Sequence, residues 1–472
     1  MSKDFQKAFV TTYVLVFGAI FLVLIGGLFS LILFQLKLNV RRIAWNESLQ
    51  IAEAGVGYYH WCLNNEAQDN CETEKNYFDL EGKPLGKFSL TVTAEVSCSE
   101  TAKREMESRG WTNEFTNVIR KIKTSYGRET VAKYSFLINN NVWAGADLEI
   151  RGPYHSNGGI RMDGENQSIV TSAKEDWLCT SSFGCSWSSC PSGCVREGSA
   201  CRCPGVFTTT GNANQDLFSW PVPYFDFESI TIDLARVKAR ALPFPQEKYW
   251  PPSTQIDASG KGYHLKFNQN GTAGIWIITG LTATEGYSLE EGWQDDYFTI
   301  SNEYLYKTVT LDPSCSVIFV EDNLWVEGKV KGKTILVSAD LLDPAKDTSV
   351  VLPSDIEYAS SDGSDALAVL GEKNVLIAPN SPDTMELRGI FIAQKGRFGR
   401  NHYPNNIKTS LEIHGAIVSS GRVGTKWISG SAVVSGYRKR ENYVDPNLVY
   451  GAPAFVPTVN SNFDILEWEE VD

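Results

Sequence analysis

Six cysteines fall within one short stretch of the sequence, and their spacing implies a definite chemistry. The gaps between them are five, four, three, six and one residues, and no histidine lies among them. A structural zinc site usually has two C-x2-4-C pairs separated by a spacer, and only Cys190 and Cys194 approach that spacing. We therefore predict three disulfides here, in any of 15 pairings, and no metal site. The six are Cys179, Cys185, Cys190, Cys194, Cys201 and Cys203.

The other four cysteines extend this prediction. Cys62 and Cys71 are nine residues apart and are expected to pair, whereas Cys98 and Cys315 could pair only if the segments that carry them dock on each other. Ten cysteines in one chain are typical of an oxidising compartment outside the cytosol. Disulfides would also hold together a Ser- and Gly-rich segment that has little core of its own.

Residues for catalysis are sparse in comparison. The five histidines show no H-E-x-x-H spacing, and no G-x-S-x-G motif occurs. Two acidic pairs occur, Asp295 with Asp296 and Asp362 with Asp365. Either pair could bind calcium or could supply the paired acids of a carbohydrate-cleaving site. Acidic residues in turns are more often solvated loop ends. We therefore predict no catalytic, cofactor-binding or metal-binding residue, and a protein that is not an enzyme.

The balance of charge excludes a further class of partner. The chain has 56 Asp and Glu residues against 43 Lys and Arg residues, with a formal net charge of -13. It contains no basic run and no stripe of basic and aromatic residues, which nucleic-acid-binding domains usually carry. We therefore predict no nucleic-acid partner.

The first element that must position these residues is a membrane anchor. After a short N-terminal tail at residues 1–7, residues 8–36 contain no charged side chain over 29 positions. A helix needs roughly 20 apolar residues to cross the hydrocarbon layer, and no A-x-A cleavage site follows the run. We predict a retained, single-pass transmembrane helix in contact with membrane lipid, an unprocessed N-terminus, and an extracytoplasmic C-terminal domain in the cell membrane.

The helix is expected to continue beyond the membrane as a stalk. Between residues 37 and 62, apolar residues recur at three- and four-residue steps among charged ones, which is typical of an amphipathic helix. Residues 63–130 then predict a small antiparallel meander. Apolar and polar residues alternate from Phe88 to Val96, and we expect two more strands at 103–111 and 117–127.

This helix and meander resemble a known family. The stretch from Asn46 to His60, with its Ala52-Glu53-Ala54-Gly55 step, and the strands after it are similar to the N-terminal segment of type IV pilus-associated proteins of the PilX-like kind. The resemblance covers about the first quarter of the chain. It implies a bacterial surface protein with pilus or envelope proteins as partners. Because Phe17 precedes Gly18 and no Glu occurs in the apolar run, we expect no prepilin cleavage.

The remainder of the chain predicts a β-solenoid-like domain. The segments that begin at Ile150 and Ile413 share the pattern I-x-G-x-x-x-S-x-G, and looser echoes begin at Val326 and Leu387. Each coil of a solenoid needs an inward aliphatic residue and a small residue where the strand turns a corner. The spacings are irregular, so we predict an interrupted, right-handed solenoid-like domain, with an irregular β-sandwich as the alternative.

The expected boundaries follow from this pattern. Residues 131–171 form the first part of the solenoid-like domain and residues 261–456 form its main part. A cysteine-rich and Pro-aromatic insertion at 172–260 separates the two parts, and an acidic C-terminal tail follows at 457–472.

The predicted fold class is mainly β. It has an N-terminal transmembrane α-helix with an amphipathic extension, a small antiparallel meander, and the solenoid-like domain. The expected function is that of a membrane-anchored cell-surface structural or adhesive protein, similar to type IV pilus-associated accessory proteins. Two alternatives are a membrane-tethered, carbohydrate-active β-helix enzyme and a cell-envelope scaffold unrelated to pili.

Overall fold

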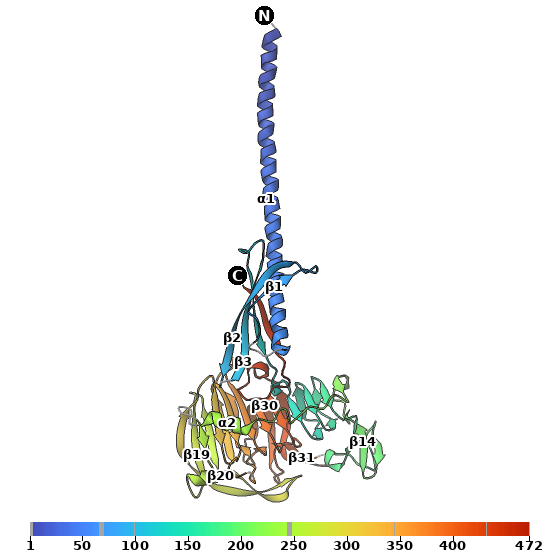
Figure 1. The fold of residues 1–472 in the computed structure, drawn as a ribbon. Coiled ribbons are helices and arrows are strands. Elements are labelled where there is room, and N and C mark those ends of the chain that lie inside the picture. Colours follow the sequence, from blue (N-terminus) through green and yellow to red (C-terminus); the bar gives the residue numbers. More distant parts are fainter. Residues whose placement is uncertain are drawn as a thin grey trace. The chain divides into compact units, whose positions relative to one another are not determined.

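The computed structural model describes residues 3–65, 70–98, 100–242, 248–343, 345–430 and 432–471 (Figure 1). It is mainly β, with one long N-terminal apolar helix, an antiparallel sheet, and a large domain of parallel strands. The predicted fold class is therefore confirmed. The chain forms two compact units. The first contains residues 1–95, 103–127 and 462–472, and the second contains residues 96–102 and 128–461.

Helix α1 (Lys3–Asn65) is uninterrupted over 63 residues. Almost every described side chain from Val10 to Ile43 is exposed, and the apolar part has a mean hydropathy of 2.7. At about 1.5 Å per residue, the uncharged run is about 43 Å long and exceeds the roughly 30 Å of hydrocarbon in a bilayer. Among the described helices, only α1 is long and apolar enough to cross a membrane. Residues 3–7 of the expected N-terminal tail belong to the helix, and Met1 and Ser2 lie outside the described residues.

Beyond the apolar run, one stripe of α1 is buried in the first unit. Its residues recur at three- and four-residue steps, so they lie on one face of the helix. Most of them form a core with side chains of the antiparallel sheet, including Phe88, Met106 and Ile122. The predicted amphipathic extension is therefore confirmed. The stripe contains Ala44, Ser48, Ile51, Ala52, Val56, Tyr59 and Leu63.

The antiparallel sheet has the strand order β1-β2-β3-β4-β33. Strands β2, β3 and β4 correspond to the predicted meander. The segment expected as an acidic tail instead contains β33, which pairs antiparallel with β4, and Glu470 forms an ion pair with Arg120. The bounds are β1 (Glu74–Phe78), β2 (Pro84–Ser97), β3 (Glu100–Thr112), β4 (Arg120–Gly127) and β33 (Asp464–Val471).

The Ala52-Glu53-Ala54-Gly55 step lies where β3 approaches α1 closely. Ser108 Oγ donates a hydrogen bond to the carbonyl oxygen of Ala52, at 2.8 Å. A Cβ atom added at Gly55 would lie 2.3 Å from Ser108 Oγ. Small residues at Ala52 and Gly55 therefore allow this contact, while Glu53 is exposed on another face of the helix.

The second unit is built from parallel strands that stack in ladders. One ladder has the spatial order β17-β21-β23-β26-β28-β30-β5-β8-β11-β16. Its bounds are β17 (Tyr249–Trp250), β21 (Ser316–Val320), β23 (Lys333–Ser338), β26 (Ala366–Gly371), β28 (Thr384–Ala393), β30 (Ile407–Ser419), β5 (Phe136–Ile138), β8 (Tyr154–Ser156), β11 (Val170–Ser172) and β16 (Phe218–Ser219).

A second ladder has the order β18-β22-β25-β28-β30-β32-β7-β10. Because β28 and β30 belong to both ladders, each of these strands turns a corner between two faces of the stack. The new bounds are β18 (Tyr263–Asn268), β22 (Leu324–Val330), β25 (Ile356–Tyr358), β32 (Ala432–Tyr443), β7 (Leu148–Arg151) and β10 (Glu165–Asn166).

Shorter strands complete the remaining side of the stack. Strand β24 pairs with β22 and β27, strand β27 pairs with β29, and strand β9 pairs with β6 and β15. Two short helices, α2 and α3, also belong to this unit. The bounds are β24 (Val350–Leu352), β27 (Val375–Ile377), β29 (Phe398–Gly399), β6 (Val142–Ala144), β9 (Ile160–Met162), β15 (Val206–Phe207), β31 (Lys426–Ser429), α2 (Leu234–Ala241) and α3 (Pro446–Gly451).

The order of strands in space differs from their order in the chain. Strands β5, β8, β11 and β16 come early in the sequence, yet β5 stacks on β30, which comes late. The two predicted parts of the domain are therefore one continuous stack. The predicted insertion is also narrower than expected, because β15, β16 and β17 within 172–260 pair with strands of the stack. Residues 243–247, which belong to the Pro-aromatic part of this insertion, lie outside the described residues.

The repeated sequence pattern marks equivalent places in the stack. Leu387 lies beside Ile413, and Gly389 beside Gly415, in the pairing of β28 with β30. Both glycines have positive φ angles, of +142° and +140°, which glycine adopts more readily than other residues. Ile150 lies two strands beyond Ile413 on the same ladder, and all three aliphatic side chains are in the main hydrophobic core. The inward aliphatic residue and the small corner residue are therefore both present.

A long antiparallel hairpin also belongs to the second unit (Figure 1). It consists of β19 (Thr272–Ser288) and β20 (Gly292–Thr310). The inner face of the hairpin packs through Phe298 and Ile300 onto a small core that contains Trp325 and Ala378. Because these two residues come from different coils, the hairpin crosses several coils of the stack.

Candidate functional site: a disulfide-linked module on the parallel-strand domain

The cysteine cluster folds as a small antiparallel sheet. Strand β14 lies between β12 and β13. Three disulfides join Cys179 to Cys185, Cys190 to Cys201, and Cys194 to Cys203. The bounds are β12 (Asp176–Cys179), β13 (Val195–Glu197) and β14 (Ala200–Pro204), and residues 176–204 are called the disulfide module below.

The other four cysteines are also paired. Disulfides join Cys62 to Cys71 and Cys98 to Cys315, so none of the ten cysteines is free. Cys98 belongs to the segment 96–102 of the second unit, and its pairing with Cys315 therefore lies within that unit. The sequence alone did not decide whether Cys98 pairs with Cys315.

Three sulfur atoms of the module lie close together. Those of Cys179, Cys185 and Cys203 are all within 4.8 Å of one another. Each sulfur is bonded in a disulfide, whereas a metal is bound by thiolates. This proximity therefore reflects the packing of neighbouring disulfides.

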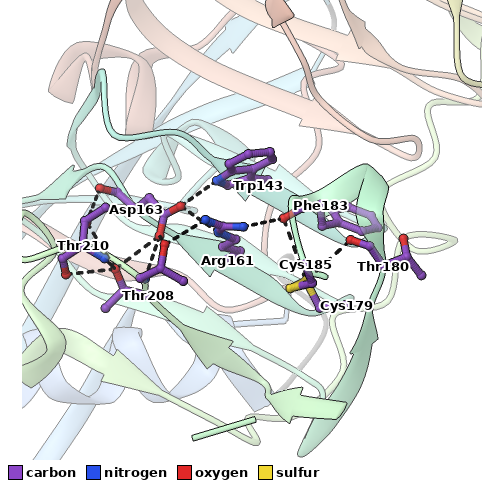
Figure 2. Close-up of polar contacts among 10 residues, drawn as sticks. Trp143, Arg161, Asp163, Cys179, Thr180, Phe183, Cys185, Thr208 and Thr210 are labelled. Carbon is purple, nitrogen blue, oxygen red and sulfur yellow. Dashed lines mark hydrogen bonds and ion pairs between the residues drawn. A yellow bond between two sulfur atoms is a disulfide. The ribbon is translucent and has the colours of Figure 1, made fainter. Parts of the chain in front are cut away.

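A buried ion pair lies under the module. Figure 2 shows Asp163 beside Arg161, which lies on β9. Asp163 Oδ2 accepts hydrogen bonds from Arg161 Nε at 2.7 Å and from Trp143 Nε1 at 2.8 Å. Its Oδ1 accepts from the Thr209 backbone N–H at 2.8 Å and from Thr209 Oγ1 at 2.9 Å. The residue is 3% exposed, so these donors replace the water that the carboxylate loses.

Two arginines hold one loop of the module. Arg161 Nη1 donates to the Phe183 carbonyl oxygen at 2.9 Å, and Arg422 Nη2 donates to the Ser182 carbonyl oxygen at 2.8 Å (Figure 2 shows the first). The Arg422 guanidinium also lies 4.2 Å from the centre of the Phe183 ring. Trp177 covers Gly159, where an added Cβ would lie 2.0 Å from the indole ring. The module is thus fixed to the stack by charge-assisted hydrogen bonds and by packing.

This arrangement is suited to positioning rather than to catalysis. Both oxygens of Asp163 already accept two close hydrogen bonds, and the Arg161 guanidinium also donates to Thr209 Oγ1 at 2.8 Å. A general acid or base needs an oxygen that can reach a substrate. The Arg161–Asp163 pair therefore serves to hold the disulfide module in one orientation.

The module presents other side chains to solvent. Trp187 is 49% exposed, and the Arg196 guanidinium lies 4.4 Å from the centre of its ring. On β14, Arg202 lies between Leu178 and Val195, both exposed. The module therefore combines a rigid, cross-linked frame with exposed apolar groups, which is a common property of contact surfaces.

The two members of the first acidic pair have different surroundings. Asp295 and Asp296 are neighbours on β20, and successive residues of a strand point to opposite faces. Asp296 points inward and accepts from Asn401 Nδ2 at 2.7 Å and Tyr403 Oη at 3.0 Å, whereas Asp295 is exposed. They therefore cannot act together on one ligand.

The carboxylates of the second acidic pair accept hydrogen bonds from backbone N–H groups. Asp365 accepts from the N–H groups of Gly332 and Ser360, both at 2.7 Å, and Asp362 accepts from the N–H of Ser364 at 3.0 Å. Both carboxylates thus stabilise turns, which is the common role of Asp in such positions.

One histidine forms a charged cluster that the sequence did not reveal. His264 on β18 lies with Nδ1 2.8 Å from Glu303 Oε2 on β20 and Nε2 3.4 Å from Glu327 Oε1 on β22. Lys266 Nζ lies 2.7 Å from the other oxygen of Glu303. Burial by itself would lower the pKa of His264, but the hydrogen bond to Glu303 and the charges of both glutamates outweigh it, and the pKa is raised.

We expect this cluster to stabilise the second unit most strongly between pH 4.5 and 6.5. Because folding raises the pKa of His264, its contribution to stability is complete below pH 6.5. This contribution is lost as the pH rises towards the pKa that His264 has in the folded state. The contact with His264 lowers the pKa of Glu327. The hydrogen bonds to His264 and Lys266 outweigh burial and lower the pKa of Glu303. Their stability is full above 4.5 and is lost at lower pH. Thermal unfolding of the protein and of His264→Gln, measured against pH, checks this window.

A suitable control for that experiment is His414→Gln, because His414 lies on β30, away from this cluster in the pairing of strands. The difference between the protein and His264→Gln should peak in the stated window. A difference that grows steadily above pH 7 would contradict the assignment of a charged His264.

The remaining histidines have separate surroundings. His60 Nε2 lies 2.9 Å from the Phe463 carbonyl oxygen, and His155 Nδ1 lies 2.9 Å from Thr171 Oγ1. His414 stacks on Tyr443 with ring centres 4.8 Å apart. His402 packs among aromatic rings at the end of the β19–β20 hairpin. That aromatic group was not found from the sequence, although Tyr287 and Trp293 flank its turn symmetrically.

No protein-family model matches the sequence, and no curated protein matches it. Among solved structures, the chain is similar to the competence-associated pilin ComZ from Thermus thermophilus, with a TM-score of 0.34 and 10% sequence identity over 91% of this chain and 97% of that chain. This likeness is too low to establish a shared fold or function.

Proposed function

We propose that the chain is a membrane-anchored, pilus-related surface protein that makes contacts and does not catalyse a reaction. The observation that carries this proposal is that the two parts of α1 have different surroundings. Its first part is apolar and exposed over a length that spans a bilayer, and its last part forms the core of the antiparallel sheet. This is the plan expected from the resemblance to PilX-like, pilus-associated proteins.

The surroundings of the candidate acids support a non-enzymatic role. Asp163, Asp296 and Asp365 are buried and accept hydrogen bonds from neighbouring protein groups. Extended stacks of strands offer long faces that suit binding. Anchoring in a membrane also raises the effective concentration of weak contacts at the cell surface.

Placing two charges in the apolar run should release the protein from the membrane. Each Asp at the centre of a spanning helix costs on the order of 3 kcal/mol of insertion free energy. We therefore expect Leu22→Asp with Leu28→Asp to lower the share of protein in the membrane fraction. The matched control is Leu80→Asp, at a fully exposed turn of the first unit. Equal membrane shares for the double variant and the control would contradict the anchor.

Deletion of the gene tests the proposed function itself. We expect impaired attachment or pilus-dependent behaviour and unchanged turnover of polysaccharides. Restoring the gene with Asp362→Asn should restore attachment, because Asp362 serves only a local turn. Lost polysaccharide cleavage in the deletion strain would favour the membrane-tethered enzyme. Normal attachment and normal pilus behaviour would favour an envelope scaffold without a link to pili.

A further inference from the structure

The end of the β19–β20 hairpin carries a group of aromatic rings that the proposed function does not yet use. Tyr287 and Trp293 lie directly opposite each other on the two strands, with ring centres 5.5 Å apart. His402 and Trp427 pack beside them at 5.5 to 5.8 Å. Trp293 is nevertheless 57% exposed, so these neighbours support the ring without covering it.

The outward face of β20 alternates aromatic and acidic residues. Asp296 points inward, so its neighbours Asp295 and Tyr297 point outward, as does Trp293 two residues earlier. Tyr297 is 52% exposed. At about 3.4 Å per residue, Trp293 and Tyr297 lie about 14 Å apart along the strand, with Asp295 between them.

The acidic residues in this row have an unfavourable arrangement. Glu285 lies directly opposite Asp295 on the neighbouring strand, and like charges in that position destabilise a sheet. Both side chains are exposed, and neither carboxylate forms an ion pair or a side-chain hydrogen bond among the described residues. The cations Lys373 and Arg397 are engaged by Glu291 and Glu290 instead. The two carboxylates thus present acceptor oxygens to solvent between exposed rings.

The hairpin is held firmly in place. Tyr287 exchanges two backbone hydrogen bonds with His402, both of 2.9 Å. Trp427 Nε1 donates to the Arg400 carbonyl oxygen at 2.9 Å. Asp296 anchors the inner face through Asn401 and Tyr403. A surface held this way loses little conformational freedom when a ligand binds.

These features select a chemical class of ligand. A pyranose ring has an apolar C–H face that stacks on an exposed aromatic ring and hydroxyl groups at its edge that donate to carboxylates. Anionic ligands would be repelled by Glu285 and Asp295, and burial lowers the pKa of His402, so that ring adds no positive charge at neutral pH. The pairing of β19 with β20 shifts register at four places, and such irregularities hinder the pairing of a peptide strand with the edge of the hairpin.

We propose that Tyr287, Trp293 and Tyr297, with Glu285 and Asp295, form a binding platform for neutral polysaccharides, called the aromatic platform. Its spacing accommodates more than one sugar ring. The use of this platform in attachment rests on the proposed surface function, whereas the binding itself does not depend on that function.

Titration of the full chain with neutral hexasaccharides tests the platform. The protein is kept in a detergent without a sugar headgroup, and maltohexaose, cellohexaose, mannohexaose and chitohexaose are added while tryptophan fluorescence and heat are recorded. We expect saturable binding of at least one probe. Trp293→Ala should weaken it on the order of tenfold or more, since a central aromatic anchor often carries much of the binding free energy. Asp295→Asn should weaken it less.

The matched control is Trp187→Ala, which removes another exposed tryptophan, from the disulfide module. It should bind like the unchanged protein. Absence of binding to every neutral probe, an equal loss in Trp187→Ala, or tighter binding of a heparin hexasaccharide would each overturn the platform. Circular dichroism checks that Trp293→Ala is folded, as expected for an exposed side chain.

Attachment assays separate this proposal from the proposed function. If purified Trp293→Ala no longer binds sugar while cells that carry it attach normally, the platform stands and its role in attachment fails. If no sugar binds but deletion of the gene abolishes attachment, the platform fails and the surface function stands.

Discussion

Replacing Asp163 by Ala is expected to lower the free energy of unfolding by about 3–5 kcal/mol, because it leaves the buried Arg161 guanidinium without its carboxylate. The change also removes the acceptor of Trp143 Nε1 and of two Thr209 donors. Chemical unfolding followed by tryptophan fluorescence measures the loss. The disulfide module should at the same time become sensitive to limited proteolysis, because Arg161 also holds the Phe183 carbonyl oxygen.

Two variants separate this effect from a general loss of charge. Asp295→Ala removes an exposed carboxylate that lies opposite Glu285, so it should not lower the free energy of unfolding. Arg161→Met combined with Asp163→Leu removes both charges and should recover part of the loss, because a buried ion pair can often be replaced by apolar residues at little cost. A loss below about 1 kcal/mol in Asp163→Ala would mean that water reaches Arg161 in place of the carboxylate.

Local features of the fold could be predicted from the sequence. The apolar run of α1, the buried stripe that follows it, and strands β2 to β4 each depend on the periodicity of neighbouring residues. The same holds for the aliphatic and glycine positions around Leu387 and Ile413. These patterns arise from burial on one side of a single element, so they can be read without knowledge of the partner.

Long-range pairings could not be predicted in the same way. The stacking of β5 on β30 joins Phe136 to Ile417 across most of the chain, and no local pattern identifies that partner. Strand β33 is rich in acidic residues, so its composition is typical of a tail even though β4 pairs with it. The disulfide pairs, likewise, depend on how the small sheet of the module brings its strands together.

The same distinction between local patterns and long-range contacts applies to the functional surfaces. The cysteine cluster is recognisable because disulfide chemistry needs one residue type at high local density. The Arg161–Asp163 pair and the aromatic platform draw on residues from separate coils, such as Thr209 with Asp163 and Trp427 with Tyr287. Asp295 and Asp296 show the opposite case, because adjacency in the sequence places them on opposite faces of one strand.

Replacing Gly415 by Ala is expected to destabilise the parallel-strand domain by about 2–6 kcal/mol, the sum of about 1–3 for backbone strain and about 1–3 for overpacking. The residue has a φ of +140°, and an added Cβ would lie 1.9 Å from the carbonyl oxygen of Gly389 on the neighbouring strand. That oxygen is backbone and cannot rotate away as a side chain would. Thermal and chemical unfolding of the full chain measure the change.

The matched control is Gly211→Ala, in the same unit, where no atom lies within 4 Å of an added Cβ and φ is not positive. It should change the free energy of unfolding by less than about 1 kcal/mol, in the stabilising direction if the backbone conformation suits alanine. Equal stability of the two variants would contradict a crowded corner at Gly415. The expected difference follows from the stacking of coils, because Gly389 and Gly415 occupy the same corner in successive strands and the second can approach the first only without a side chain.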